Sequence, residues 1–160
     1  MLSITAQRLI GAWHLQRWEL VNADGTRTAP FGSDATGLLL YTRDGWMSAN
    51  IMAAGRKPLS RANPRTAPAT ERASAFDGYF GYCGRWRVVP GGVHHEVTIA
   101  LNPALVGTLQ VRRARLTSST LTLSADEAVT AGMRTHRLVW RRTPRRIGPT
   151  RRTRTQRNER

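Results

Sequence analysis

Eight stretches of alternating or continuous apolar residues, each bounded by turn-forming residues, predict eight β-strands. Asn22-Ala23-Asp24-Gly25, Pro90-Gly91-Gly92 and Ser118-Ser119 are turn signals, and Asp44-Gly45 is typical of a tight hairpin. Thr70-Glu71 favours the start of one short helix over 71–80. The expected strands are 12–21, 37–42, 46–52, 82–89, 93–100, 108–117, 121–124 and 133–142.

Strand periodicity also predicts which side chains share a face. In 12–21, Trp13, Leu15 and Val21 fall on one face, and Trp18 and Leu20 fall on the other. The stretch 53–69 carries three prolines and four basic residues without an apolar period, which indicates a loop or a lid. In the expected helix, Ala73, Phe76, Tyr79 and Phe80 would lie on one side.

Short strands joined by tight turns favour an all-β architecture, either a barrel or a sandwich. A closed barrel leaves no exposed sheet edges, whereas an open sheet of eight strands would have to protect two. We therefore expect an all-β, eight-stranded antiparallel barrel with one short helix between the third and fourth strands. Closed barrels of about eight strands leave room for one small ligand.

The length of 160 residues fits one domain, which we place at 1–142. The single cysteine, Cys83, excludes an internal disulfide. No apolar run reaches the roughly 20 residues of a membrane span, and the first residues lack the order of a signal peptide. These features predict a soluble, cytoplasmic protein without a membrane span.

The formal net charge of +15 is unevenly distributed, because nine arginines and one acidic residue lie from Arg141 to the end. The segment 143–160 is poor in apolar residues, so we expect it to be disordered. Nonspecific binding to nucleic acid is one interpretation of this tail. Aromatic residues are absent after Trp140, so the chain offers no stacking platform, and no specific nucleic-acid partner is expected.

Several segments, taken together and in order, resemble the small lipocalin-like domain family of bacteria and fungi, whose fold is a calycin-type β-barrel. The resemblance runs from about 9 to 142. The segments are Leu9-Ile10-Gly11-Ala12-Trp13, Pro30-Phe31-Gly32, 37–49, 76–82, Val93-His94-His95, 102–107, 110–113 and 136–142.

This resemblance implies a lipocalin-like barrel with a central cavity. It also implies that Trp13 caps the closed end, with an arginine from the end of the last strand over the indole face. Members often lie among genes for secondary metabolism. Related barrels include ligand carriers and cofactor-free cyclases or isomerases, so the fold does not decide between these functions.

Alternation along the strands nominates polar residues for the inside of the barrel. Gln110 and Arg112 share a face with the apolar Ala114 and Leu116, so we expect them to point inward. His94 and His95 are adjacent on a strand and must face opposite sides. The remaining candidates are Trp46, Ser48 and Asn50 on one strand face, His136 on the last strand, and the hydroxyls of Tyr41, Tyr79 and Tyr82.

We assign catalytic roles to Arg112, His94 and Tyr79, and substrate contacts to the other candidates. Arg112 would hold a carboxylate, enolate or enol oxygen, and a histidine or tyrosine would move a proton. Structural alternatives stay open: an internal ion pair of Arg112 with Glu96 or Glu19, a surface position or a satisfied core hydrogen bond for His94 and His95, and a polar network of Ser48 and Asn50.

The chain lacks a nucleophile elbow, a P-loop, a dinucleotide fingerprint and a zinc-protease motif. We therefore expect no metal and no cofactor. The predicted function is a cofactor-free cyclase or isomerase acting on a hydrophobic, polyketide- or terpenoid-like molecule in secondary metabolism. The alternative is a noncatalytic carrier of such a ligand. The sequence leaves formation of a homodimer open.

Overall fold

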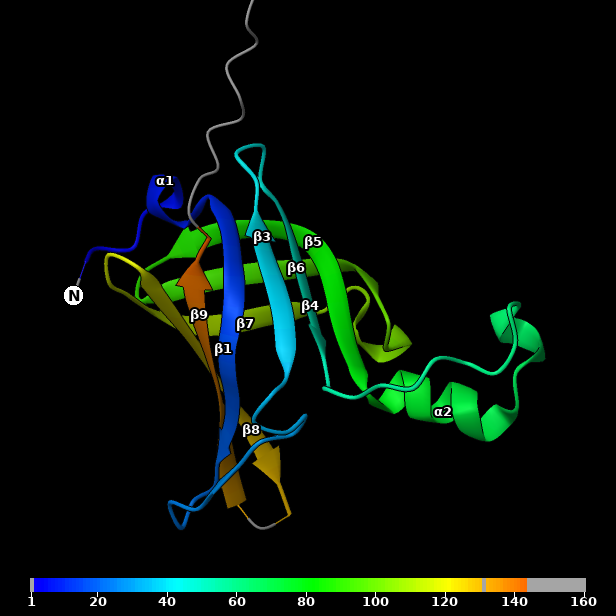
Figure 1. The fold of residues 1–160 in the computed structure, drawn as a ribbon. Helices are drawn as coiled ribbons and strands as arrows, with labels where there is room; N and C mark the ends of the chain where they lie inside the picture. The colour runs from blue at the N-terminus through cyan, green and yellow to red at the C-terminus, as the bar shows by residue number, and fades with distance from the viewer. Residues whose placement is uncertain (1, 131, 144–160) are drawn as a thin grey trace, which may run out of the picture.

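Nine consecutive antiparallel strands form one sheet, which closes on itself where β1 pairs with β9 (Figure 1). The computed structural model describes residues 2–130 and 132–143. The strands are β1 Gly11–Val21, β2 Arg27–Thr28, β3 Thr36–Tyr41, β4 Trp46–Met52, β5 Tyr79–Val89, β6 Gly92–Ala100, β7 Leu109–Leu116, β8 Thr120–Val129 and β9 Gly132–Arg142. The two-residue β2 pairs only with Leu20 and Val21 at the end of β1 and is not one of the barrel strands. The predicted all-β, eight-stranded antiparallel barrel is therefore confirmed.

The helices are short: α1 Ala6–Leu9 and α2 Ala69–Asp77, with 3-10 turns at Pro64–Thr66 and Pro103–Leu105. The predicted helix between the third and fourth long strands exists, but it ends at Asp77, and Gly78 follows it as the C-cap. Tyr79 and Phe80 belong to β5, where they pair with Met52 and Ile51 of β4. No helix in the described part of the chain is long and apolar enough to cross a membrane.

The segment that precedes α2, predicted as a loop or lid, projects sideways from the barrel together with the helix (Figure 1). None of the residues of α2 is buried, so the helix does not pack its apolar side chains into the core. In this conformation the segment does not cover the barrel interior. Residues 144–160, most of the tail predicted to be disordered, lie outside the described residues.

Two β-bulges change which side chains face the interior. The register between β1 and β9 shifts between Leu15 and Arg17, so Trp18 turns inward like Trp13 and Leu15. The prediction that Trp18 lies on the opposite face from Trp13 is therefore wrong. A second shift between β5 and β6, beside Gly84, leaves Ile99 66% exposed although Val97 is buried.

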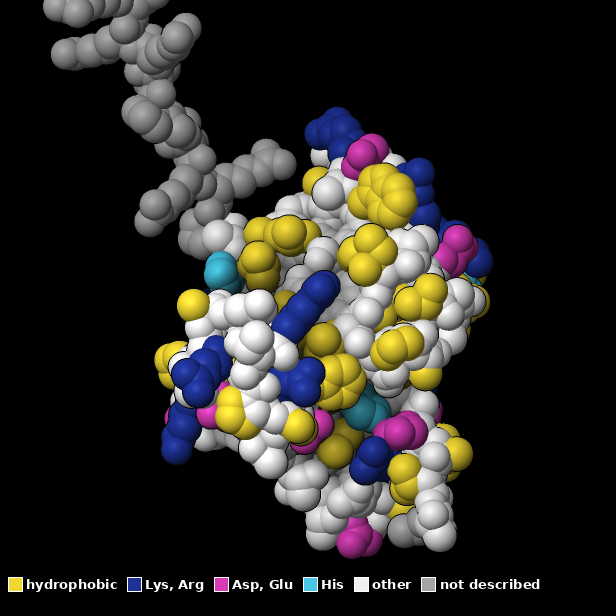
Figure 2. Space-filling view, turned by 90° about the vertical axis from the view of Figure 1, so that its right-hand side faces the viewer, with side chains coloured by type: hydrophobic (Ala, Val, Ile, Leu, Met, Phe, Trp, Pro, Cys, Tyr) yellow, Lys and Arg dark blue, Asp and Glu magenta, His cyan; other side chains and the backbone are white. Residues whose placement is uncertain are grey.

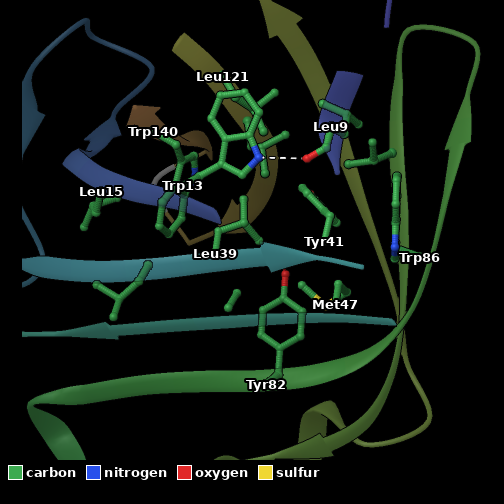
Figure 3. Close-up of a cluster of buried hydrophobic side chains, with 14 of the residues drawn as sticks. Leu9, Trp13, Leu15, Leu39, Tyr41, Met47, Tyr82, Trp86, Leu121 and Trp140 are labelled. Carbon is green, nitrogen blue, oxygen red and sulfur yellow. Dashed lines mark hydrogen bonds between the residues drawn. The ribbon is translucent and has the colours of Figure 1, made fainter. Parts of the chain in front are cut away.

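One end of the barrel is closed by a tryptophan-centred cluster (Figure 3). Trp13 is fully buried among side chains that include Leu39, Leu121 and Trp140, and its Nε1 donates a hydrogen bond of 2.9 Å to the Leu9 carbonyl oxygen. The Arg142 guanidinium carbon lies 4.1 Å from the centroid of the indole ring. Arg142 also donates hydrogen bonds to the carbonyl oxygens of Arg8 and Ile10. The expected cap of Trp13 and a terminal arginine is confirmed.

Replacing the buried indole should destabilise the protein far more than replacing an exposed one. We expect Trp13→Ala to lower the free energy of unfolding by about 3–5 kcal/mol, since a large cavity opens at the closed end. The matched control is Trp46→Ala, because Trp46 is 41% exposed. Its loss should lower stability by about 1 kcal/mol or less. Urea unfolding followed by circular dichroism measures both, and equal losses would contradict this role for Trp13.

Candidate ligand-binding site

The barrel encloses a cavity of about 430 Å³, and most of its lining is apolar. The apolar lining comes from β1, β3, β4, β5, β8, β9 and the turn at Pro103–Leu105, and includes Trp18, Leu39, Ala49, Ile51, Phe80, Leu105, Leu123, Leu138 and Trp140. Polar side chains gather in two places. Tyr82, His95, Gln110 and Arg112 form the first group, which we call the inner pole, and Asp126, Glu127 and His136 form the second. The second group is partly exposed and marks the mouth.

His95 lies at the centre of the inner pole, between two tyrosines. It is 1% exposed; its Nε2 is 2.8 Å from the Tyr41 hydroxyl oxygen and its Nδ1 is 2.8 Å from the Tyr82 hydroxyl oxygen. The Tyr82 side chain rises from β5 into the barrel, and Tyr41 reaches the cluster from β3 (Figure 3). Tyr41 and Tyr82 were predicted to reach the cavity; Tyr82 lines it, whereas Tyr41 lies behind His95.

We predict a catalytic role for His94, but it is His95 that lines the cavity. His94 is only half-buried and points away from the cavity. A signal in the sequence could have separated the two. Val93 and Val97 share the face of His95 and are buried, whereas the exposed Glu96 shares the face of His94. In a barrel the apolar face of a strand points inward, so the histidine on that face is the interior one.

Burial sets the protonation state of the inner pole. Burial lowers the pKa of His95 to about 3, with further lowering by the charges of Arg112 and His94, so this imidazole is neutral near pH 7. Burial also raises the pKa of the Tyr41 and Tyr82 hydroxyls, while the Arg112 side chain opposes both rises. Both phenols therefore keep their protons.

Gln110 and Arg112 point inward, as predicted. Arg112 donates hydrogen bonds to the Gln110 Oε1 at 3.0 Å and to the Val111 carbonyl oxygen at 3.1 Å. Among the described residues no carboxylate lies within 4.0 Å of it: Glu96 pairs with Arg87, and Glu19 pairs with Arg17, Arg27 and Arg137. The alternative of an internal ion pair with Glu96 or Glu19 is therefore wrong. Arg112 brings a positive charge to an apolar cavity.

At the mouth, His136 is held between two partners. Trp18 Nε1 donates to His136 Nδ1 at 3.2 Å, and His136 Nε2 lies 2.7 Å from Glu127 Oε2. An indole nitrogen can only donate, so Nδ1 is the acceptor and Nε2 carries the proton that bonds Glu127. Hydrogen bonds from Arg134 and His136 lower the pKa of Glu127 to about 2. His136 lines the cavity, and here its visible role is to orient Trp18.

Four other candidates lie on the outer surface of the barrel. Met47, Ala49 and Ile51 form the buried face of β4. Because side chains alternate along a strand, Trp46, Ser48 and Asn50 point outward. Apolar side chains fill the interior because burying them removes apolar area from water. Asn50 Nδ2 donates a hydrogen bond of 2.8 Å to Ser48 Oγ, and Asn50 Oδ1 accepts one of 2.7 Å from the Tyr79 hydroxyl. The inward placement of Trp46, Ser48, Asn50 and Tyr79 is therefore wrong, and Ser48 and Asn50 form a surface polar network.

The comparisons with known proteins agree with this geometry. Residues 10–143 match the lipocalin-like domain. The chain belongs to the lipocalin-like domain family. No curated protein matches the sequence significantly. The family fold is a barrel around a ligand-sized space, which suggests binding of a small hydrophobic molecule in the cavity described above.

The cavity lining of this lipocalin-like barrel offers hydrogen-bond donors, whereas its histidines and carboxylates already have partners. Both nitrogens of His95 and of His136 have partners, and Asp126 and Glu127 are ion-paired. The described residues contain no group of three or more histidine, cysteine or acidic side chains placed to hold a metal. The arrangement can thus bind and polarise an oxygen atom of a ligand. It offers no uncommitted carboxylate or imidazole in the described lining to remove a proton.

The neutral His95 should make the stability of this lipocalin-like barrel depend on pH. In the unfolded chain His95 becomes protonated below about pH 6.5. In the folded protein it becomes protonated only near pH 3. Stability should therefore fall by about 1.4 kcal/mol per pH unit over this window. His95→Gln lacks this contribution but keeps every other titrating group. In urea unfolding at pH 7, 6 and 5, the difference between wild type and variant should shrink as pH falls; a constant difference would contradict the neutral, buried state.

Proposed function

We propose that this lipocalin-like barrel binds a hydrophobic small molecule whose polar oxygen group reaches Arg112. The observation that carries the proposal is an apolar cavity with an arginine that has no carboxylate partner among the described residues. Arg112 is half-buried at the wall of this apolar cavity, and a positive group in such a place favours an anionic or strongly polar ligand.

The size of the cavity supports the same function. About 430 Å³ lies in the range of roughly 300–1,000 Å³ that is usual for small-molecule pockets. Other hollows lie on the outer surface, among them one between α2 and the barrel that is lined by Arg56, Arg65 and Arg72. Figure 2 shows hydrophobic side chains scattered among charged ones on the face that carries α2. The interior cavity is more enclosed than the outer hollow, so it would cover more of a ligand's surface.

A second candidate function is cofactor-free cyclisation or isomerisation of the same ligand, which would be polyketide- or terpenoid-like and belong to secondary metabolism. One observation favours it: the buried Tyr82 and the half-buried Arg112 both offer donors to the cavity, where they would stabilise negative charge developing on a carbonyl oxygen. The barrel walls would hold a flexible substrate in a reactive conformation. The absence of an uncommitted base in the described lining favours binding as the primary function.

Blocking the cavity should abolish binding. Ala125 lines the cavity, whereas Ala128, on the same strand, is exposed and does not. We expect Ala125→Trp to lose the bound molecule and Ala128→Trp to keep it. The measurement is native mass spectrometry of each protein after incubation with a solvent extract of the producing organism, followed by release and identification of the ligand. Equal retention by both variants would contradict binding inside the barrel.

The same experiment separates the two functions. A molecule released unchanged supports a binding protein or carrier. A molecule released in isomerised or cyclised form, at a rate that falls with Arg112→Gln, supports catalysis.

A further inference from the structure

The hydrogen-bond chain that passes through the inner pole contains one polar hydrogen more than it has hydrogen bonds. It runs from Tyr41 through His95 to Tyr82 and consists of two hydrogen bonds. Each phenol supplies one proton, and a neutral imidazole supplies one donor and one acceptor. Three protons therefore serve two bonds, and one of the two tyrosines keeps a hydroxyl proton that points elsewhere.

Burial decides which tyrosine keeps it. Tyr41 is 2% exposed and is not part of the cavity lining, and among the described residues its hydroxyl has no hydrogen-bond partner other than His95. A spare proton there would leave a buried donor unsatisfied, at a cost of about 1–3 kcal/mol. Tyr41 must therefore donate to His95 Nε2, and His95 Nδ1 must donate to the Tyr82 oxygen. The spare proton belongs to Tyr82, which faces the cavity.

The other polar groups of the inner pole are also donors. The guanidinium of Arg112 has no acceptor atom. The amide oxygen of Gln110 accepts from Arg112, and its amide nitrogen donates to Thr108 at 2.9 Å. The inner pole thus offers the Tyr82 O–H and the Arg112 N–H groups to the cavity, and its acceptors are occupied.

We propose that this set of donors, with Tyr82 oriented by Tyr41 and His95, selects ligands whose polar end is a negatively charged acceptor oxygen: a carboxylate, an enolate or a phenolate. The inference rests on the proposed function and adds the chemical class of the ligand. Neutral alcohols bind less well because they bring no charge, and amines are rejected by the charge of Arg112. Tyr82 and Arg112 touch the ligand; Tyr41 and His95 are positioning residues.

Three probes of nearly equal shape test the selection: 2-naphthoate, 2-naphthylmethanol and 2-naphthylmethylamine. Isothermal titration calorimetry at pH 7 gives the affinities. We expect 2-naphthoate to bind at least about tenfold more tightly than the alcohol, since hydrogen bonds to a charged group are worth about 1.5–3 kcal/mol, and the amine to bind weakest. Equal binding of acid and alcohol would overturn the selection and leave hydrophobic binding intact. Binding of none of the three would overturn the proposed function, and the selection with it.

Variants separate the donor from the residues that orient it. Tyr82→Phe should reduce 2-naphthoate affinity about tenfold and leave 2-naphthylmethanol almost unchanged. Tyr41→Phe should also reduce the preference for the acid, although Tyr41 is outside the cavity lining. Without its partner, His95 can accept from Tyr82 and withdraw the proton from the ligand. The matched control is Tyr79→Phe, on the outer surface, which should keep the wild-type preference. An unchanged preference in Tyr82→Phe would overturn the assignment.

A measurement on the wild-type protein is independent of whether the variants fold. Bound 2-naphthol should ionise at a lower pH than 2-naphthol in solution, because the donors stabilise the naphtholate. Absorbance during a pH titration follows this ionisation. A bound naphthol that ionises at the same or a higher pH than the free molecule would overturn the proposal.

Discussion

Pairing of β1 with both β3 and β9 is the constraint on which the rest of this structure depends. β1 carries Trp13 at one end and Trp18 further along, so the strand that closes the sheet also supplies one indole to the closed end and one to the cavity wall. A bulge between Leu15 and Arg17 makes both possible, because it turns Trp18 to the inside. Closure also leaves the eight long strands paired around the barrel, and their inner faces form one cavity.

Inside that space the polar groups are separated by position and by function. The inner pole joins the buried Tyr82 and His95 to the half-buried Gln110 and Arg112, and Tyr82 stays protonated beside a neutral His95, so it can act as a hydrogen-bond donor. The mouth is charged, and its carboxylates are held by Arg113 and Arg134. A ligand that spans the cavity would therefore meet donors at one end and ion-paired groups at the other. This polarity supports one orientation for a molecule with one oxygen-bearing end.

Strand periodicity and turn residues are local signals, and they were enough to predict the strands and the inward face of β7. Closure was expected from the cost of exposed sheet edges and from the family resemblance. Arg112 and Gln110 were placed correctly since Ala114 and Leu116 marked the face of their strand. The errors arose where a local rule was interrupted. Bulges shifted Trp18 and Ile99, and polar residues of β4 were assigned inward although their apolar neighbours occupy the core. The hydrogen bonds among Tyr41, His95 and Tyr82 join three different strands. The pattern of residues along one strand cannot predict such contacts.

The most direct test is a crystal structure of the protein with 2-naphthoate. We predict that the naphthalene ring lies between the apolar walls of the barrel. One carboxylate oxygen should lie within about 2.5–3.2 Å of the Tyr82 hydroxyl oxygen, with the Arg112 guanidinium at hydrogen-bond distance from the carboxylate. A carboxylate directed to the mouth beside His136, or a ligand in the outer hollow beside α2, would contradict the assignment of the inner pole as the ligand-binding site.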